Sequence, residues 1–460
     1  MMKKIGGALL ITLLQSAVSL VAQIVLARIL SPNIFGQFAT CSVLVTILMA
    51  LANLQCDKYI ISGKGQTVQD RLKASAYIEL IVAIMFFILA LSILPMILKL
   101  INKDELIYYS LALACSVVYT PFTRGKAVLD SELMFFKARL PQLCAQIISA
   151  TIAIFLALNE YGLSALIIWR LCAYFIEILI LTSIHGSPKF KIIEREERKA
   201  VIGFVKPLYW SSVIFTVYAS FDYYVLAIFI SDSELGLYWL SFQLTNYLLI
   251  IKTTFNNILL PYYCQSKNNM MKVELLNNHT KLLILFYLVV SIVSMMISDV
   301  AINIVLGEKW SKMTTIFNLF TIIVMFKAFS SSFLPYLIAV DKRKAELQST
   351  VFALLNLTIF LPILSLKFGV FGALVAVMIS TFLNFIYLHC KYIYEIKNNN
   401  HLKTFSLMIL VSIIIYGSSF LHILPRLGML TPILLGATIM IVKNLHELKN
   451  VINKTSGLLS

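Results

Sequence analysis

Charged residues are scarce in this sequence. Only 13% of the 460 residues are Asp, Glu, Lys or Arg, whereas 60% are hydrophobic. A soluble chain typically carries about 25% charged residues, which cover its surface. The shortage of charge therefore excludes a string of soluble domains, and the mean hydropathy of +0.88 indicates a polytopic membrane protein.

Cysteine and catalytic motifs are also sparse. The seven cysteines are odd in number and include no CxxC pair, which argues against a disulfide framework or a structural zinc site. The sequence has no GxxxxGK phosphate loop, no HExxH helix and no His/Cys cluster with metal-ligand spacing. We therefore expect neither an enzyme nor a bound metal or cofactor.

Long apolar runs fill most of the chain. A helix needs about 20 mostly apolar residues to cross a bilayer, and helices satisfy their own backbone hydrogen bonds there. Fourteen segments fit, so the expected fold class is all-α. The expected spans are residues 5–30, 35–56, 74–98, 106–120, 140–158, 163–184, 205–230, 235–262, 281–306, 314–340, 347–366, 371–394, 405–421 and 429–442. The first run is too long for a signal peptide, so it is expected to be a span.

Lysine and arginine are distributed unevenly between alternate loops. Walking from loop to loop, 28 of the 38 fall on the side that holds the N-terminus, seven on the other side, and three inside spans. The positive-inside rule then predicts that both termini are cytoplasmic. The same asymmetry accounts for the net charge of +16 without a nucleic-acid partner.

Three short stretches recur in the same order in the two halves of the chain. LSPNIFGQF (30–38) resembles ISDSELGLY (230–238), residues 121–133 resemble 335–347, and residues 161–166 resemble 368–373. Each pair falls at equivalent interhelical turns, which predicts a parallel repeat of two six-helix bundles, a known transporter plan. We expect bundles over 1–186 and 205–397, a cytoplasmic linker over 187–204, and two further helices with a cytoplasmic tail over 398–460. Chance similarity of helix corners is the alternative.

The stretch ARILSPNIFGQFA (27–39) carries a family resemblance. It matches, position by position, the first interhelical turn of Wzx-type flippases, the polysaccharide transport family of the MOP (multidrug/oligosaccharidyl-lipid/polysaccharide) exporter superfamily. Asp222, the turn at 235–238 and LGEKW at 306–310 are also similar to that family. The residues that define the turn motif are Arg28, Ser31, Pro32 and Gly36. Arg28 lies at the outer end of its span, where anchoring the helix is its expected role.

The resemblance implies a function. Family members move an undecaprenyl-pyrophosphate-linked oligosaccharide, such as an O-antigen repeat unit for lipopolysaccharide, across a bacterial inner membrane. A polysaccharide polymerase and a chain-length regulator are further candidate partners, besides membrane lipids. The alternatives are a MATE-like drug or cation antiporter, a lipid II flippase and, with less support because no large outer loop is expected, a polysaccharide polymerase.

Cations inside spans are the candidate substrate contacts. An ionisable group at the bilayer centre costs at least about 2.5 kcal/mol, so each one is a functional candidate. Arg170, Lys252 and Lys327 could bind the pyrophosphate and acidic sugars, and arginine suits bidentate phosphate binding best. Tyr174 and Tyr218 offer aromatic faces for sugars.

Asp222 and Glu177 are the carboxylates inside spans, and either could take up a proton or sodium ion that drives transport. A structural alternative remains open for these groups. Arg170 with Glu177, or Lys327 with Asp222, could be buried ion pairs that hold helices together, while Lys252 could extend its ammonium to the membrane edge.

Overall fold

The described part of the chain is helical throughout. The computed structural model describes residues 2–62, 67–186, 190, 195–266, 269–340, 342, 344–396, 440, 441 and 444, and no β-strand occurs in these residues. The chain forms two compact units that meet in sequence at Gly236 and Leu237. The predicted all-α membrane fold is thus confirmed.

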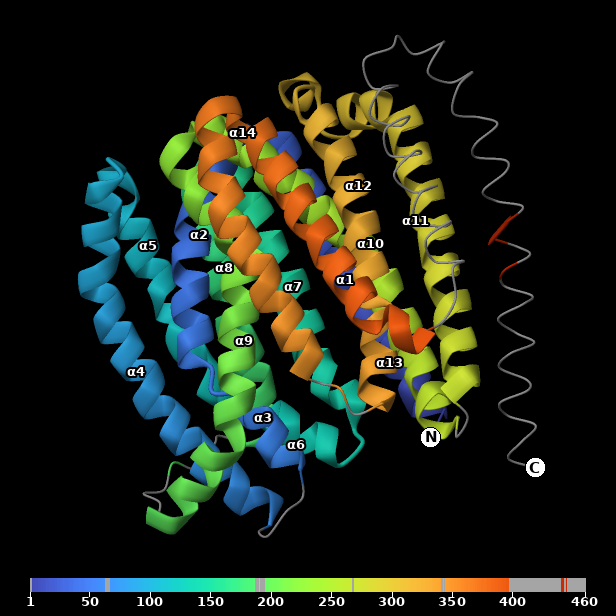
Figure 1. Cartoon of the computed structure of the whole chain (residues 1–460). Coiled ribbons are helices and arrows are strands. Elements are labelled where there is room, and N and C mark those ends of the chain that lie inside the picture. Colours follow the sequence, from blue (N-terminus) through green and yellow to red (C-terminus); the bar gives the residue numbers. More distant parts are fainter. Residues whose placement is uncertain are drawn as a thin grey trace. The chain divides into compact units, whose positions relative to one another are not determined.

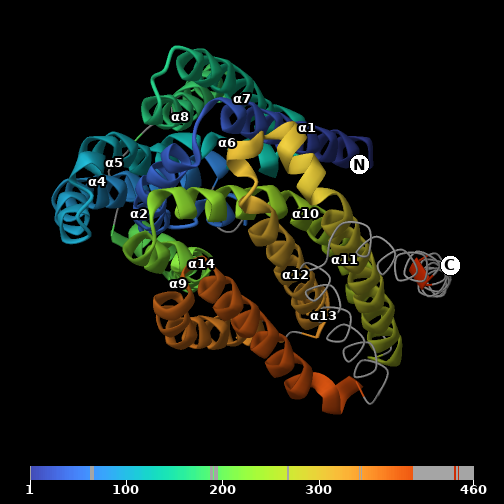
Figure 2. The same ribbon diagram turned by 90° about the horizontal axis from the view of Figure 1, so that it is seen from above.

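The first unit contains nine α-helices and the beginning of a tenth. Their bounds, with two intervening 3₁₀ helices, are α1 (Met2–Ile29), α2 (Pro32–Ala52), α3 (Cys56–Ile61), α4 (Val68–Leu100), η1 (Asp104–Leu106), α5 (Ile107–Ala114), η2 (Cys115–Thr123), α6 (Gly125–Ser131), α7 (Phe135–Leu158), α8 (Leu163–His185), α9 (Arg195–Phe229) and α10 (Asp232–Gln265). α7 packs along both α8 and α1 (Figure 2), and α2 packs against α9 (Figure 1).

The second unit contains the rest of α10 and the helices that follow it. They are α11 (Asn269–Val305), η3 (Glu308–Trp310), α12 (Met313–Ser331), α13 (Phe333–Ala339) and α14 (Lys344–Ile396). α12 packs against both α11 and α14. Gly369 interrupts α14 with a φ of 56°, a left-handed conformation that favours glycine. α14 therefore covers two of the predicted spans.

Each predicted span up to residue 394 coincides with described helix, but α10, the helix of the eighth predicted span (235–262), is not among the stretches that are apolar enough to cross a membrane. Ten stretches of the described residues are long and apolar enough to cross a membrane. The fourth predicted span is less regular than expected, since α5 gives way at Cys115 to the 3₁₀ helix η2, which contains Pro121. The last two predicted spans, 405–421 and 429–442, lie outside the described residues.

The boundary between the compact units differs from the predicted repeat boundary. The linker at 187–204 was expected to separate two bundles, whereas the first compact unit continues through α9 to Gly236. The repeat itself stays a prediction, because a duplicated sequence and a compact unit need not share an end.

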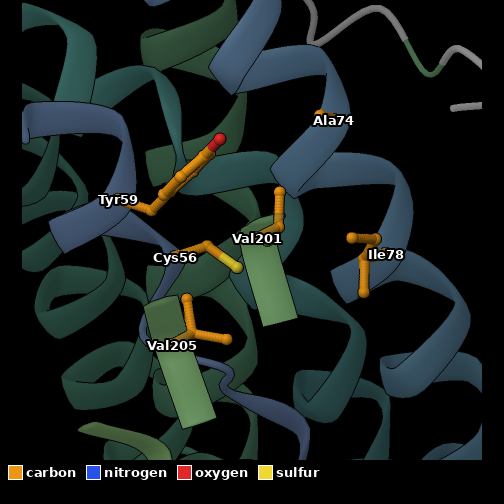
Figure 3. Packing of buried hydrophobic residues seen from close by; sticks show 6 residues of the cluster. All are labelled: Cys56, Tyr59, Ala74, Ile78, Val201 and Val205. Atoms are coloured by element: carbon orange, nitrogen blue, oxygen red, sulfur yellow. The ribbon is translucent and has the colours of Figure 1, made fainter. Parts of the chain in front are cut away.

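A small apolar cluster attaches the beginning of α9 to the first unit. Figure 3 shows Val201 and Val205 of α9 beside Cys56, with side chains of α3 and α4 around them. Its buried members are Cys56, Tyr59, Ala74, Ile78, Val201 and Val205. Apolar contact therefore fixes the beginning of α9 against α3 and α4.

Hydrogen bonds continue the attachment of α9 to α2. The Tyr209 hydroxyl donates to the Leu51 carbonyl and the Tyr224 hydroxyl donates to the Val43 carbonyl, each at 3.1 Å. These bonds satisfy polar groups that lipid could not. They explain why α9 joins the first unit.

A buried ion pair joins α4 to the residues before α6. Arg124 donates through Nε at 2.5 Å and through Nη2 to Glu79, whose side chain is fully buried. The Leu54 N–H donates to the same carboxylate at 3.1 Å, and Arg124 also donates to Asn53 Oδ1 at 2.8 Å. This network satisfies the backbone where α2 ends, as a buried charge requires.

We predict that Glu79→Ala strongly destabilises the protein. The substitution leaves the buried Arg124 guanidinium with only the more exposed Asp57, 3.5 Å from Nη1, as a carboxylate partner. Breaking a buried pair in this way costs up to about 3–5 kcal/mol. Thermal unfolding of the purified protein in detergent measures the effect. Glu196→Ala is the control, since Glu196 pairs with Lys199 at the surface and its side chain is 82% exposed. An equal and small loss in both variants would contradict the prediction.

Candidate functional site

Three of the predicted site residues lie on one face of α8. Arg170, Tyr174 and Glu177 follow one another at helical spacing. The Arg170 guanidinium carbon lies 5.2 Å from the centroid of the Tyr174 ring. This cation–π contact orients the exposed guanidinium, whose N–H groups can still bind a ligand.

Tyr119, which the sequence did not single out, extends this face onto η2. Its ring lies against that of Tyr174, with centroids 4.3 Å apart and planes inclined by 43°. The Tyr119 hydroxyl donates to the Glu177 carboxylate. Two aromatic rings and one guanidinium are therefore held in fixed positions side by side.

Glu177 forms its ion pair with Lys126 of α6. The Lys126 ammonium lies 2.5 Å from Glu177 Oε1 and also donates to Gln142 at 3.3 Å. The Glu177 side chain is 5% exposed and that of Lys126 is 21% exposed. The sequence-based alternative paired Glu177 with Arg170. Instead, Lys126 compensates the carboxylate. Arg170, Lys126 and Glu177 taken together therefore have a net positive charge.

The sequence alone does not predict that Lys126 and Tyr119 contact Glu177. The Lys/Arg pattern assigns Lys126 to a predicted cytoplasmic loop, and this lysine lies 51 positions from Glu177 in the chain. The spacing rules that connect residues on one helix cannot connect α6 or η2 to α8. Only the packing of η2 and α6 against α8 reveals the contact.

Asp222 lies on α9 in the same unit. It is 4% exposed, and its Oδ1 accepts a hydrogen bond from the backbone N–H of Tyr223 at 3.1 Å. Tyr218 precedes it by one helical turn and is partly exposed. Both predicted residues therefore belong to the first unit, whereas Lys327, the partner suggested by the sequence, belongs to the second.

The second unit holds the two remaining predicted cations. Lys252 of α10 and Lys327 of α12 are partly buried and close enough to repel each other electrostatically. The Lys327 ammonium lies 5.2 Å from the centroid of the Phe242 ring. Two like charges in a medium of low dielectric repel strongly, so an anion placed beside them would be stabilised.

Tyr287 holds the backbone beside Lys252 in place. Its hydroxyl donates to the Leu248 carbonyl at 2.7 Å and accepts from the Lys252 N–H at 3.2 Å. Phe242 is fixed in turn by Phe320, with ring centroids 5.6 Å apart. These contacts fix the backbone beside Lys252 and the ring beside Lys327.

The turn-motif residues form the corner between α1 and α2. Arg28 lies in the last turn of α1, Ser31 is extended, and Pro32 is the first residue of α2, where a missing N–H costs nothing. Gly36 lies in the second turn of α2. Within the described residues, no three His, Cys, Asp or Glu side chains come together as a metal site would require.

Comparison of the sequence with known families gives a match over most of the chain. The profile of a family described as "Polysaccharide biosynthesis protein" matches residues 25–315. No curated protein sequence matches significantly.

Solved structures with a similar fold are membrane transport proteins. The lipid II flippase MurJ, in an inward closed conformation, is similar over 95% of this chain and 99% of its own, with a TM-score of 0.72 and 16% identity. A multidrug resistance MATE family transporter of the MOP superfamily, in an inward-facing conformation, is similar over 84% of this chain and 96% of its own, with a TM-score of 0.63 and 15% identity.

At these identities the structural likeness establishes the fold, whereas the family profile establishes the family. The two agree with the resemblance indicated by the turn at 27–39. The chain therefore belongs to the polysaccharide biosynthesis protein family and has the all-helical membrane fold of the flippases and transporters of the MOP superfamily.

Proposed function

We propose that the protein is a flippase for lipid-linked oligosaccharides. It moves undecaprenyl-pyrophosphate-linked repeat units of an O-antigen or another surface polysaccharide from the cytoplasmic to the outer leaflet of a bacterial inner membrane. Transport occurs by alternating access, with both termini in the cytoplasm. The family and the fold support a MOP-superfamily flippase, and the residues below support the anionic substrate.

The observation that carries this proposal is the Lys252–Lys327 pair. The two ammonium groups, on α10 and α12, lie within electrostatic reach of each other in a partly buried place, where an anionic group would interact favourably with both. A pyrophosphate carries several negative oxygens and would interact with both lysines. The adjacent Phe242 ring adds an apolar surface beside the charges.

The α8 face suits the glycan. Tyr119 and Tyr174 present adjacent rings on which the apolar faces of sugars can stack. Arg170, oriented on Tyr174, can donate to phosphate or to the carboxylate of an acidic sugar. Tyr218 of α9 offers a further aromatic contact.

Two alternatives differ in substrate. MurJ is named as a lipid II flippase, and lipid II also carries a polyprenyl pyrophosphate, so the lysine pair would serve either cargo. A MATE-like antiporter for cationic drugs fits less well, because Lys252 and Lys327 would repel a cation. No observation favours a polysaccharide polymerase, which we expect instead, with a chain-length regulator, as a partner.

The first test is deletion of the gene. We expect lipid-linked repeat units to accumulate on the cytoplasmic side of the membrane and surface polysaccharide to be lost, because the units no longer reach the outer leaflet. Surface polysaccharide and extracted lipid-linked sugars measure the two effects. Normal surface polysaccharide would overturn the proposal, and accumulation of lipid II instead would establish the alternative cargo.

We predict that Lys327→Ala abolishes export and that Lys327→Arg retains it in part, because the site needs positive charge. Surface polysaccharide in the complemented deletion strain measures export, and immunoblotting of membranes confirms that the protein is present. The control is Lys312→Ala, which removes an equivalent charge from an exposed position of the same unit. Full export with Lys327→Ala would exclude this lysine from substrate binding.

Asp222 and Glu177 are our two candidates for ion coupling, and the Glu177 carboxylate is paired with Lys126. We expect Asp222→Asn to remove the dependence of transport on a proton or sodium gradient, since the amide cannot bind either ion as a carboxylate does. Transport into vesicles with each gradient imposed separately measures this. Glu177→Gln serves as the comparison. An unchanged gradient dependence in Asp222→Asn would reject Asp222 as the coupling residue.

A further inference from the structure

Two turns that the sequence identified as repeats of one another meet in the first unit. α2 begins at Pro32 and α10 begins at Asp232, and their first turns cross with their backbones in direct contact. A Cβ added to Gly36 would overlap the carbonyl oxygen of Asp232, and a Cβ added to Gly236 would overlap the carbonyl oxygen of Pro32. The contact is reciprocal, and only glycine at both positions permits it.

An ion pair spans the same crossing. The Lys103 ammonium lies 2.5 Å from Asp232 Oδ1 and 3.5 Å from the Thr40 hydroxyl of α2. The Lys103 and Asp232 side chains are each 13% exposed, and Thr40 is fully buried. Lys103 therefore connects the beginning of α10 with the third turn of α2.

The local backbone fixes Lys103 in this place. Asn102 takes a left-handed conformation with a φ of 55°, which asparagine tolerates better than most residues, and ends α4. The Lys103 N–H then donates to the Leu98 carbonyl at 2.9 Å. This closure of the helix end is a Schellman-type cap, and it directs the chain back across the end of α4.

Asp232 has a second electrostatic role at the crossing. The N-terminal ends of α2 and α10 both carry partial positive charge, so bringing them together is unfavourable. The Asp232 carboxylate, in the first turn of α10, offsets that charge as well as the charge of Lys103. Neutralising Asp232 should therefore loosen the crossing more than neutralising Lys103.

The Lys/Arg pattern assigns this crossing to the outer side of the membrane. The turns after α1, α4 and α9 are all on the side with few basic residues. Substrate that leaves on the outer side, as the proposed function requires, must pass a barrier that opens there.

We propose that the Gly36–Gly236 crossing, latched by the Lys103–Asp232 ion pair, is the closed outer gate of the transport cycle. The inference rests on the proposed function. A crossing made of glycine backbone suits a gate because neither glycine has a side chain that must be withdrawn when the helices part. The ion pair then supplies a specific and reversible hold.

Cys41 provides a reporter for this gate. It lies on α2 five residues after Gly36, is fully buried, and is within electrostatic reach of both Lys103 and Asp232. In a chain whose other cysteines are replaced by serine, a membrane-impermeant maleimide added to right-side-out vesicles would label Cys41 only when the outer end opens. This measurement does not depend on which cargo is carried.

We expect Lys103→Gln to speed the labelling of Cys41 and Asp232→Asn to speed it further. The exchanged pair, Lys103→Asp with Asp232→Lys, should return the rate toward that of the parent, although the reversed charge no longer suits the helix ends. Parent-like labelling in Asp232→Asn would overturn the gate. So would an exchanged pair that labels as fast as the single variants.

A second set of variants, Gly36→Ala and Gly236→Ala, tests the glycine contact. The added methyl groups should prevent the crossing from closing and so raise the rate at which Cys41 is labelled. Gly203→Ala is the matched control, because this exposed glycine of α9 has space for a Cβ with no neighbouring atom within 4 Å. Should the alanine variants fail to reach the membrane, the charge variants still decide. Equal labelling in all three glycine variants would contradict a tight crossing.

Cross-linking with a carbodiimide distinguishes a gate that opens from a contact that never opens. The Asp232 carboxyl adds to the carbodiimide to form an O-acylisourea. The Lys103 amine then attacks the acyl carbon, so that an amide forms and the carbodiimide leaves as its urea. Mass spectrometry identifies the cross-linked peptide, with Lys103→Gln as the negative control. The cross-link should abolish the residual labelling of Cys41 in the otherwise native gate. Unchanged labelling after cross-linking, or no cross-link at all, would overturn the latch.

The gate and the proposed function can fail separately. If deletion of the gene leaves surface polysaccharide intact, the cargo is wrong, yet Cys41 labelling still reports whether the crossing opens. If labelling is insensitive to every variant while deletion blocks export, the protein is the flippase but its outer gate lies elsewhere.

Discussion

The lipid interior offers no partner for backbone polar groups, and this constraint shapes every described element. Each N–H and carbonyl must be bonded within the protein, which helices achieve and irregular segments do not. The backbone therefore departs from the α-helix in only a few ways within the described residues. The 3₁₀ helix η2 keeps its hydrogen bonds while adapting to Pro121, and the reversal at Gly369 divides α14 without a long loop.

The same low dielectric determines where charges can be placed. Glu79 with Arg124 and Glu177 with Lys126 are opposite charges in close contact, so each pair lowers the cost of its own burial. Lys252 and Lys327 are arranged differently, since like charges lie near each other.

α9 shows how sequence repetition and compact packing can differ. In the predicted repeat it would begin a second set of helices, but its contacts with α2, α3 and α4 make it part of the first unit. The repeated turns at Gly36 and Gly236 end up against each other for the same reason, as α9 delivers the beginning of α10 to the beginning of α2.

The sequence by itself determined the membrane fold, the helical spans and the family, because hydrophobic length and turn residues such as Pro32 and Gly36 act locally. It also found Arg170, Tyr174 and Glu177 as one face, since helical spacing connects them. Tertiary structure alone decided that Lys126 and Tyr119 join Glu177, and that Lys103 reaches Asp232 129 positions away. Such pairs depend on how separate helices pack, and no periodicity within one helix encodes that.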